Sequence, residues 1–167
     1  ATGAIIASSR DAADMRRRMG ARSLALAADS RTASTRWRGI VAARLPKPEW
    51  PETRMLITAM NARTGDPAVF DRLSGVPLVD AVAASCSSGA AYPIGAEAYI
   101  DGGYRSNADN ADLAAGSARV LVLSPFSGRT RTPEEWGLHL AAQVDELRRG
   151  GSRVETVFPL PEVEHLF

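Results

Sequence analysis

The sequence predicts an α/β fold in which helices pack against a mostly parallel sheet. Short apolar runs that are typical of strands alternate along the chain with segments of helical period. The chain has 167 residues, of which 45% are hydrophobic, so it can form one ordinary core. We therefore expect a single domain over residues 1–167.

The N-terminal part is expected to be helical from residue 1 to about residue 28. It is rich in Ala, Leu, Met and Arg, and Met15, Met19 and Leu26 roughly keep a 3.6-residue period. A polar loop is expected at residues 29–35. The three arginines at positions 16 to 18 are predicted to form a solvated helix face; contact with a phosphate or a lipid headgroup is the alternative.

The middle of the chain predicts a β-hairpin. The prolines of residues 45–52 exclude a central strand and a continuous helix there. Residues 55–60 form a compact apolar run that indicates a buried strand. A turn at residues 64–66 follows, where Gly65 supplies the positive φ, and residues 68–70 return as the second strand.

The remaining elements alternate in the α/β manner. We expect a helix at residues 76–86, a short extended segment at 99–101, and a short helix at 109–115 that Asp109 or Asn110 caps. Residues 119–123 (RVLVL) predict a buried strand, and residues 153–158 a final one. Between them, an amphipathic helix is expected at 133–149, because acids stand at its start, arginines at its end, and glycine follows.

Composition excludes several classes of function. With 20 basic and 19 acidic residues, the chain lacks the excess positive charge of a nucleic-acid binder. Its single cysteine, Cys86, excludes an internal disulfide and favours a reducing, cytoplasmic setting. His139 and His165 lack metal-ligand spacing, so no metal is expected. No apolar window is long enough for a transmembrane segment, and the first ten residues do not resemble a signal peptide.

The segment YIDGGYRSNADNADL holds the strongest candidate for chemistry. Asp101 ends an apolar strand and precedes Gly102 and Gly103, which allow a sharp turn and a close approach by another group. Ligands of open α/β sheets bind at the carboxyl ends of strands, which would suit a functional carboxylate. From these residues alone, a plain turn is the commoner explanation.

The surrounding order of elements resembles the second half of the patatin-like phospholipase domain. Residues 56–125 carry a strand, the run GVPLVDAVAASCSSGAAYPIGAEAYIDGG, a short polar helix and an apolar strand, as in that family. The resemblance implies a three-layer α/β/α sandwich and a Ser–Asp dyad that hydrolyses acyl esters, as a phospholipase A, a lysophospholipase or an esterase does. Asp101 would be the base, and Gly102 and Gly103 would shape its loop. Lipid or acyl-ester substrates at a membrane surface are implied, without metal or organic cofactor.

The sequence departs from the family because it contains no G-x-S-x-G elbow and no glycine-rich oxyanion loop. The nearest imitation, SCSSG around Ser87, follows a helix, which is the wrong context. The opening ATGAII resembles the helix after the elbow, which implies that the N-terminal strands and the serine belong to a complementary upstream segment. Two alternatives remain: an inactive patatin-like binding or regulatory module, and a different α/β binding protein in which Asp101 is a turn residue.

The other candidates have structural explanations. A buried structural role is expected for Cys86 in preference to a reactive thiol. His139 is expected to be a surface or core residue, and Asp109 and Asp112 to cap a helix, since their spacing fits no calcium loop. Core packing is expected, in preference to a lipid interface, for three tryptophans: Trp37, Trp50 and Trp136.

Overall fold

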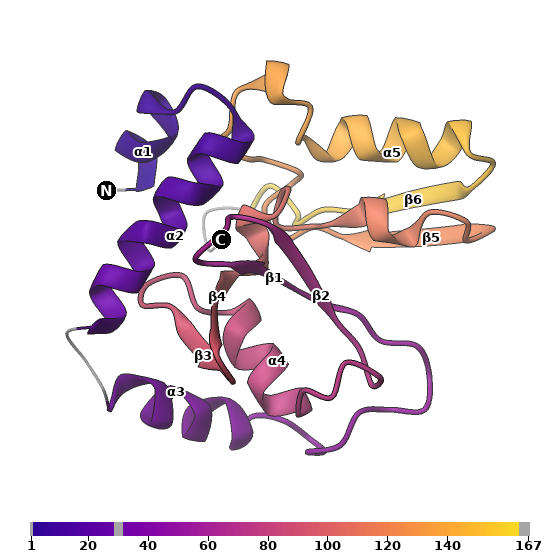
Figure 1. Ribbon diagram of the computed structural model, residues 1–167. Helices are drawn as coiled ribbons and strands as arrows, with labels where there is room; N and C mark the ends of the chain where they lie inside the picture. Colours follow the sequence, from indigo (N-terminus) through magenta and orange to yellow (C-terminus); the bar gives the residue numbers. More distant parts are fainter. Residues whose placement is uncertain (1, 29–31, 164–167) are drawn as a thin grey trace. The chain divides into compact units, whose positions relative to one another are not determined.

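The computed structural model describes residues 2–28 and 32–163 (Figure 1). The chain forms two compact units, Ala1–Arg105 and Ser106–Phe167, and each is described by itself. That both units belong to one domain stays a prediction. The expected loop at 29–35 lies partly outside the described residues.

The first unit begins with two helices where one was predicted. Helix α1 spans Thr2–Ser8 and α2 spans Ala12–Ala28. The break has a local cause, because Asp11 Oδ1 accepts the Asp14 N–H at 2.7 Å and so caps the start of α2. Helix α3 (Ala33–Ala42) begins inside the segment that was expected to be a loop.

A four-stranded sheet forms the centre of this unit, in the order β2 (Pro67–Phe70), β1 (Ile57–Asn61), β4 (Glu97–Asp101) and β3 (Tyr92–Ile94). The predicted hairpin is confirmed, with Ile57 opposite Phe70. Every pairing in the sheet is antiparallel, so the mostly parallel sheet expected from the sequence is not found here. The physical reason is the short connections within the pairs β1–β2 and β3–β4, since tight turns join only antiparallel strands.

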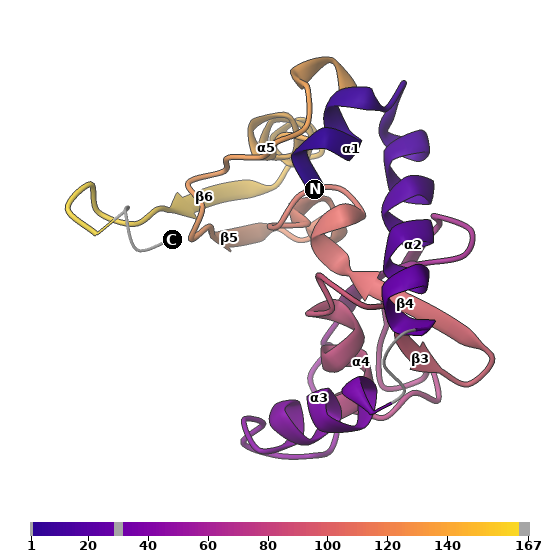
Figure 2. The ribbon, with the colours of Figure 1, turned by 90° about the vertical axis from the view of Figure 1, so that its left-hand side faces the viewer.

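Helices cover the two faces of this sheet. Helix α4 (Leu78–Ser85) confirms the predicted helix and packs against Ala59, whereas Met60 and Ile100 point to the opposite face and are fully buried. Helix α2 contacts β1 and β4; β4 lies between α2 and α4 in Figure 1, and in Figure 2 it crosses α2. Gly20 of α2 lies so close to the Ala62 backbone that a Cβ would overlap its carbonyl group.

The second unit is a β-α-β arrangement. Strands β5 (Arg119–Leu123) and β6 (Arg153–Val157) are parallel, and α5 (Leu140–Arg149) connects them. These elements confirm the predicted strands and helix, except that the helix begins later. A 3₁₀ turn, η3 (Glu134–Trp136), ends at Gly137 with a φ of +67° and separates residues 133–136 from α5.

The core of this unit lies between α5 and one face of the two strands, where Val122, Val144 and Val154 are buried. Strand β5 was expected to be buried, but Leu121 and Leu123 are 60% and 68% exposed. The short helix expected at 109–115 is a 3₁₀ helix, η2 (Ala111–Ala114). Within the described residues of both units, no helix has the length and apolar character needed to cross a membrane.

Candidate functional site

Asp101 is the last residue of β4 and lies beside the end of α4. It pairs with Ala59 of β1, and its N–H donates to the carbonyl oxygen of Ser87 at 3.0 Å. Ser87 follows α4 by two residues. The sheet register and this hydrogen bond therefore fix the backbone of Asp101 from two sides.

The carboxyl group of Asp101 is partly buried. Its Oδ1 accepts the N–H of Gly103 at 2.8 Å, which caps the 3₁₀ turn η1 (Gly102–Tyr104). Burial raises the pKa of Asp101, and the hydrogen bond from Gly103 opposes that rise only in part. A carboxylate with a raised pKa is a stronger base than an exposed aspartate.

Gly102 allows η1 to pass directly over β1. A Cβ at this position would overlap Oγ1 and the carbonyl oxygen of Thr58. No other residue type fits at position 102 without movement of the backbone. Gly103 has a different role, because its N–H donates to Asp101 Oδ1. The two glycines thus act differently in holding the aspartate, although the sequence predicts one shared role for them.

A pocket of about 680 Å³ opens within the first unit, and Asp101 is not among the residues that line it. Its walls come from the end of α2, the start of α3, the loop after α4, and strands β3 and β4. Ser87, which accepts the N–H of Asp101, is part of the wall. Cys86 is part of it too, and both desolvation and the charge of Asp101 raise the pKa of its thiol.

Neither Ser87 nor Cys86 is placed to be a nucleophile. Ser87 is 6% exposed, and its Oγ donates to the carbonyl oxygen of Ala83 at 2.6 Å. Cys86 is exposed, contrary to the expected burial, because it lies just past the end of α4. Its raised pKa leaves less of the reactive thiolate at neutral pH.

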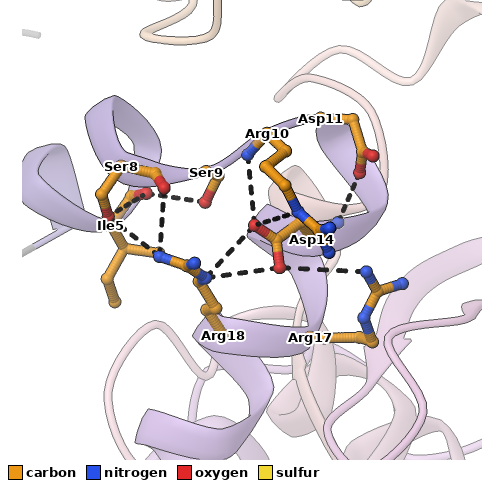
Figure 3. Close-up of polar contacts among 8 residues, drawn as sticks. All are labelled: Ile5, Ser8, Ser9, Arg10, Asp11, Asp14, Arg17 and Arg18. Carbon is orange, nitrogen blue, oxygen red and sulfur yellow. Dashed lines mark hydrogen bonds and ion pairs between the residues drawn. The ribbon is translucent and has the colours of Figure 1, made fainter.

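Arginines surround Asp14 where α1 and α2 meet (Figure 3). Asp14 is 7% exposed, and its Oδ2 accepts the Arg10 N–H at 3.1 Å. Arg18 and Arg17 approach its carboxylate to 3.2 and 3.8 Å. The hydrogen bond from the Arg10 backbone, helped by the charges of Arg18 and Arg10, lowers the pKa of Asp14 against the effect of burial.

Arg16 differs from its two neighbours. Arg17 and Arg18 lie on the exposed face that the sequence predicts, but Arg16 is half-buried. Its Nε donates to the carbonyl oxygen of Gly65 and its Nη1 to that of Arg105, both at 3.2 Å. Arg16 therefore connects α2 to the β1–β2 turn and to the segment after η1.

Two of the three tryptophans are partly buried and pack against the core, in agreement with the predicted packing. The Nε1 of Trp37 donates to the carbonyl oxygen of Ala83 at 2.9 Å, and that of Trp50 to Val76 at 2.8 Å. Both rings pack against the core of the first unit. Trp136 is half-buried in η3 of the second unit.

The polar candidates of the second unit belong to a structural network. Gln143 of α5 is 6% exposed, and its Nε2 donates to Ser106 Oγ at 2.8 Å and to Asp112 Oδ1 at 3.0 Å. Its Oε1 accepts from Asn107 at 3.0 Å, and Asn107 Oδ1 in turn accepts the N–H of Asp109 at 2.9 Å. Asp112 is thus bound to α5 and does not have the expected capping role.

The histidines and possible metal ligands offer no further site in the described part of the chain. His139 lies at the start of α5 with Nε2 at 3.0 Å from the carbonyl oxygen of Thr132, which is a structural contact. His165 lies outside the described residues. Among residues 2–28 and 32–163, no group of three or more His, Cys, Asp or Glu could hold a metal ion.

One charged cluster was missed from the sequence. Asp80 of α4 accepts hydrogen bonds from Arg38 Nε at 2.8 Å and from the Tyr92 hydroxyl at 2.6 Å, and so connects α3, α4 and β3. Burial acts to raise the pKa of Asp80, but these hydrogen bonds and the charge of Arg38 outweigh it and lower the pKa. The signal in the sequence was a lone acid in the apolar run VPLVDAVAAS.

No family model, curated protein or solved structure matches this chain. The function of this chain is therefore inferred from its residues and from the geometry around Asp101.

Proposed function

We propose that this chain is part of a patatin-like serine hydrolase that cleaves carboxylic esters of lipids, with Asp101 as the base of a Ser–Asp dyad. The observation that supports this proposal most is the raised pKa of Asp101 in a partly buried position at the end of a strand. An exposed aspartate in a turn stays hydrated, so burial would not raise its pKa in this way. Among the described residues, no charged side chain lines the pocket that contains Ser87, which suits an apolar substrate.

The proposed reaction needs only groups that the dyad supplies. Asp101 takes the proton of the serine hydroxyl as its oxygen attacks the ester carbonyl, and the proton then passes to the leaving alcohol. Water hydrolyses the resulting acyl-enzyme with Asp101 again as the base. Because the N–H of Gly103 holds Oδ1, we assign the proton transfer to Oδ2.

The proposal places the serine and the oxyanion loop in a complementary segment beyond these 167 residues. The sequence contains no G-x-S-x-G elbow, and the hydroxyl of Ser87 is bonded to α4. In the complete enzyme, β5 and β6 would belong to a larger, mostly parallel sheet of the three-layer α/β/α type. The proposal includes a reducing, cytoplasmic location, for which the free thiol of Cys86 is the support. Access to a membrane surface is part of the proposal because the substrates are lipid esters.

The test is ester hydrolysis by the full-length protein. We expect turnover of p-nitrophenyl butyrate, and we expect Asp101→Asn to lower kcat by about 10²–10⁴-fold, the usual contribution of a general base. The amide keeps an acceptor for the Gly103 N–H, so the turn is preserved. The acidic limb of the kcat/KM profile should lie above the ordinary aspartate pKa of 3.8.

Asp66→Asn is the matched control, because Asp66 is an exposed aspartate in the β1–β2 turn. It should leave kcat unchanged. Equal turnover by Asp101→Asn and the unsubstituted protein would refute the base assignment. A full-length protein without any esterase activity would favour the inactive binding module.

A further inference from the structure

We propose that the pocket of the first unit, whose described lining carries no charged side chain, binds an alkyl chain, namely the acyl chain of the substrate. The identification of this alkyl chain as part of a substrate rests on the proposed function. The binding of an alkyl chain by itself does not. We call this cavity the acyl pocket. It lies between Leu24 and Ala27 of α2, Trp37 of α3, and the loop at residues 86–91.

The chemistry of the walls selects the ligand. No Asp, Glu, Lys, Arg or His lines the acyl pocket in the described residues, and alanine is the commonest residue there. A charged ligand would lose its hydration without gaining a partner, which costs several kcal/mol. Its volume of about 680 Å³ lies within the range of small-molecule sites.

Two polar groups of the walls are already bonded elsewhere. The Trp37 Nε1–H and the Ser87 Oγ–H both donate to the carbonyl oxygen of Ala83, at 2.9 and 2.6 Å. These bonds fix the indole ring and direct the serine hydroxyl toward the end of α4. Ser34 and Ser88 also line the pocket, but most of its surface is apolar, as an alkyl chain requires.

The pocket shares Ser87 with the surroundings of the proposed catalytic group, although Asp101 itself does not line it. Ser87 lies in its wall and accepts the N–H of Asp101 at 3.0 Å, and the charge of Asp101 raises the pKa of Cys86 in the same wall. An acyl chain that enters the pocket along Ser87 would carry its ester group toward Asp101. We therefore expect turnover to depend on the length of the acyl chain.

Cys86 provides a direct reporter of occupancy, since it lines the pocket and is the single cysteine of this sequence. We would measure the rate at which iodoacetamide modifies Cys86 in the full-length protein, by peptide mass spectrometry, with and without 1-decanol. Decanol at ten times its Kd should slow the modification about tenfold, because only the unoccupied fraction reacts.

Ala27→Phe should fill the pocket and abolish most of this protection. Ala25→Phe is the matched control, because Ala25 lies on the same helix, is exposed, and does not line the pocket. It should keep the full ratio of rates without and with decanol. Absence of protection in the unsubstituted protein would overturn the inference, as would equal ratios in the two variants.

The outcomes separate this inference from the proposed function. Protection by decanol in a protein without esterase activity would support the pocket and refute the hydrolase. Esterase activity without protection would support the hydrolase and refute the pocket. In an active protein, Ala27→Phe should also lower kcat/KM for p-nitrophenyl decanoate relative to p-nitrophenyl butyrate, and an unchanged ratio would count against the inference.

Discussion

Three aspartates of the first unit show how the surroundings decide the role of one residue type. Arginines and backbone N–H groups surround Asp14 and lower its pKa, and Arg38 and Tyr92 do the same for Asp80. At Asp101 burial prevails and the pKa rises. The first two carboxylates stabilise the fold as anions, whereas the third is held where its charge is unfavourable. Such a cost is typical of functional groups.

Asp101→Asn should therefore make the protein more stable at neutral pH. The folded-state pKa of Asp101 lies above its unfolded value of 3.8, so its contribution to stability is complete below 3.8 and is lost as the pH rises through the folded pKa. The amide resembles the neutral acid and avoids this loss. Urea denaturation should show a gain at neutral pH that disappears near the unfolded pKa. A loss of stability at neutral pH would indicate a purely structural cap.

Asp80 should show the opposite dependence on pH. Its folded pKa lies below 3.8, so its contribution is present above 3.8 and is lost as the pH falls through the folded pKa. Tyr92→Phe removes one hydrogen bond to this carboxylate and should cost on the order of 1 kcal/mol at neutral pH. The cost should shrink in acid, which denaturant titrations at several pH values would measure.

The control for Tyr92→Phe is Tyr99→Phe. The Tyr99 ring packs edge-on against Phe70 at 5.1 Å between centroids, and the substitution keeps that contact. We expect a smaller, pH-independent change in the free energy of unfolding. Similar losses of unfolding free energy in both variants would show that the hydrogen bond from Tyr92 to Asp80 does not stabilise the fold.

At the level of elements, the sequence predicts those that have a local signal. The turn at Gly65 predicts the hairpin, and the basic end of the amphipathic segment predicts α5, whereas its acidic start, Glu134 and Glu135, lies in η3. Boundaries that depend on a single cap or turn were missed. Asp11 separates α1 from α2, and Gly137 separates η3 from α5. The helical composition of these two segments does not reveal either interruption.

Gly102→Ala tests whether the close approach of η1 to β1 holds Asp101 in place. The new Cβ would overlap Thr58, so the backbone must shift, at a cost of about 1–3 kcal/mol. Gly39→Ala in α3 is the control, since nothing lies within 4 Å of its Cβ position and it should gain up to about 1 kcal/mol. Thermal unfolding compares the two. Equal melting temperatures would show that η1 tolerates a side chain.

At the level of the whole chain, the sequence predicts the mixed α/β class but not the direction of most strands. Apolar runs indicate strands, yet pairing depends on how the connections close, and the short link between β3 and β4 permits only an antiparallel pair. Asp101 was predicted at the end of an extended segment, and it lies there. The pocket could not be predicted, because its walls come from separate segments that only the fold brings together.

The second unit leaves one face of its parallel pair uncovered, which is unusual for parallel strands. Leu121 and Leu123 alternate onto this face, and Val157 of β6 is opposite Leu123 in the register. We predict that Leu121→Lys clearly lowers the fluorescence of bound anilinonaphthalene sulfonate. Leu73→Lys, at an isolated leucine that is 81% exposed, should leave it nearly unchanged. An equal effect of the two substitutions would contradict an apolar patch of Leu121, Leu123 and Val157 on this face, which Arg153 and Glu155 share.

The central claim is that Asp101 activates a serine. The most direct measurement is the rate at which a fluorophosphonate probe labels the full-length protein, with the modified serine identified by peptide mass spectrometry. We predict one labelled serine outside these 167 residues and labelling at least about 100-fold slower in Asp101→Asn. No labelled serine, or labelling at the same rate in Asp101→Asn, would contradict the account.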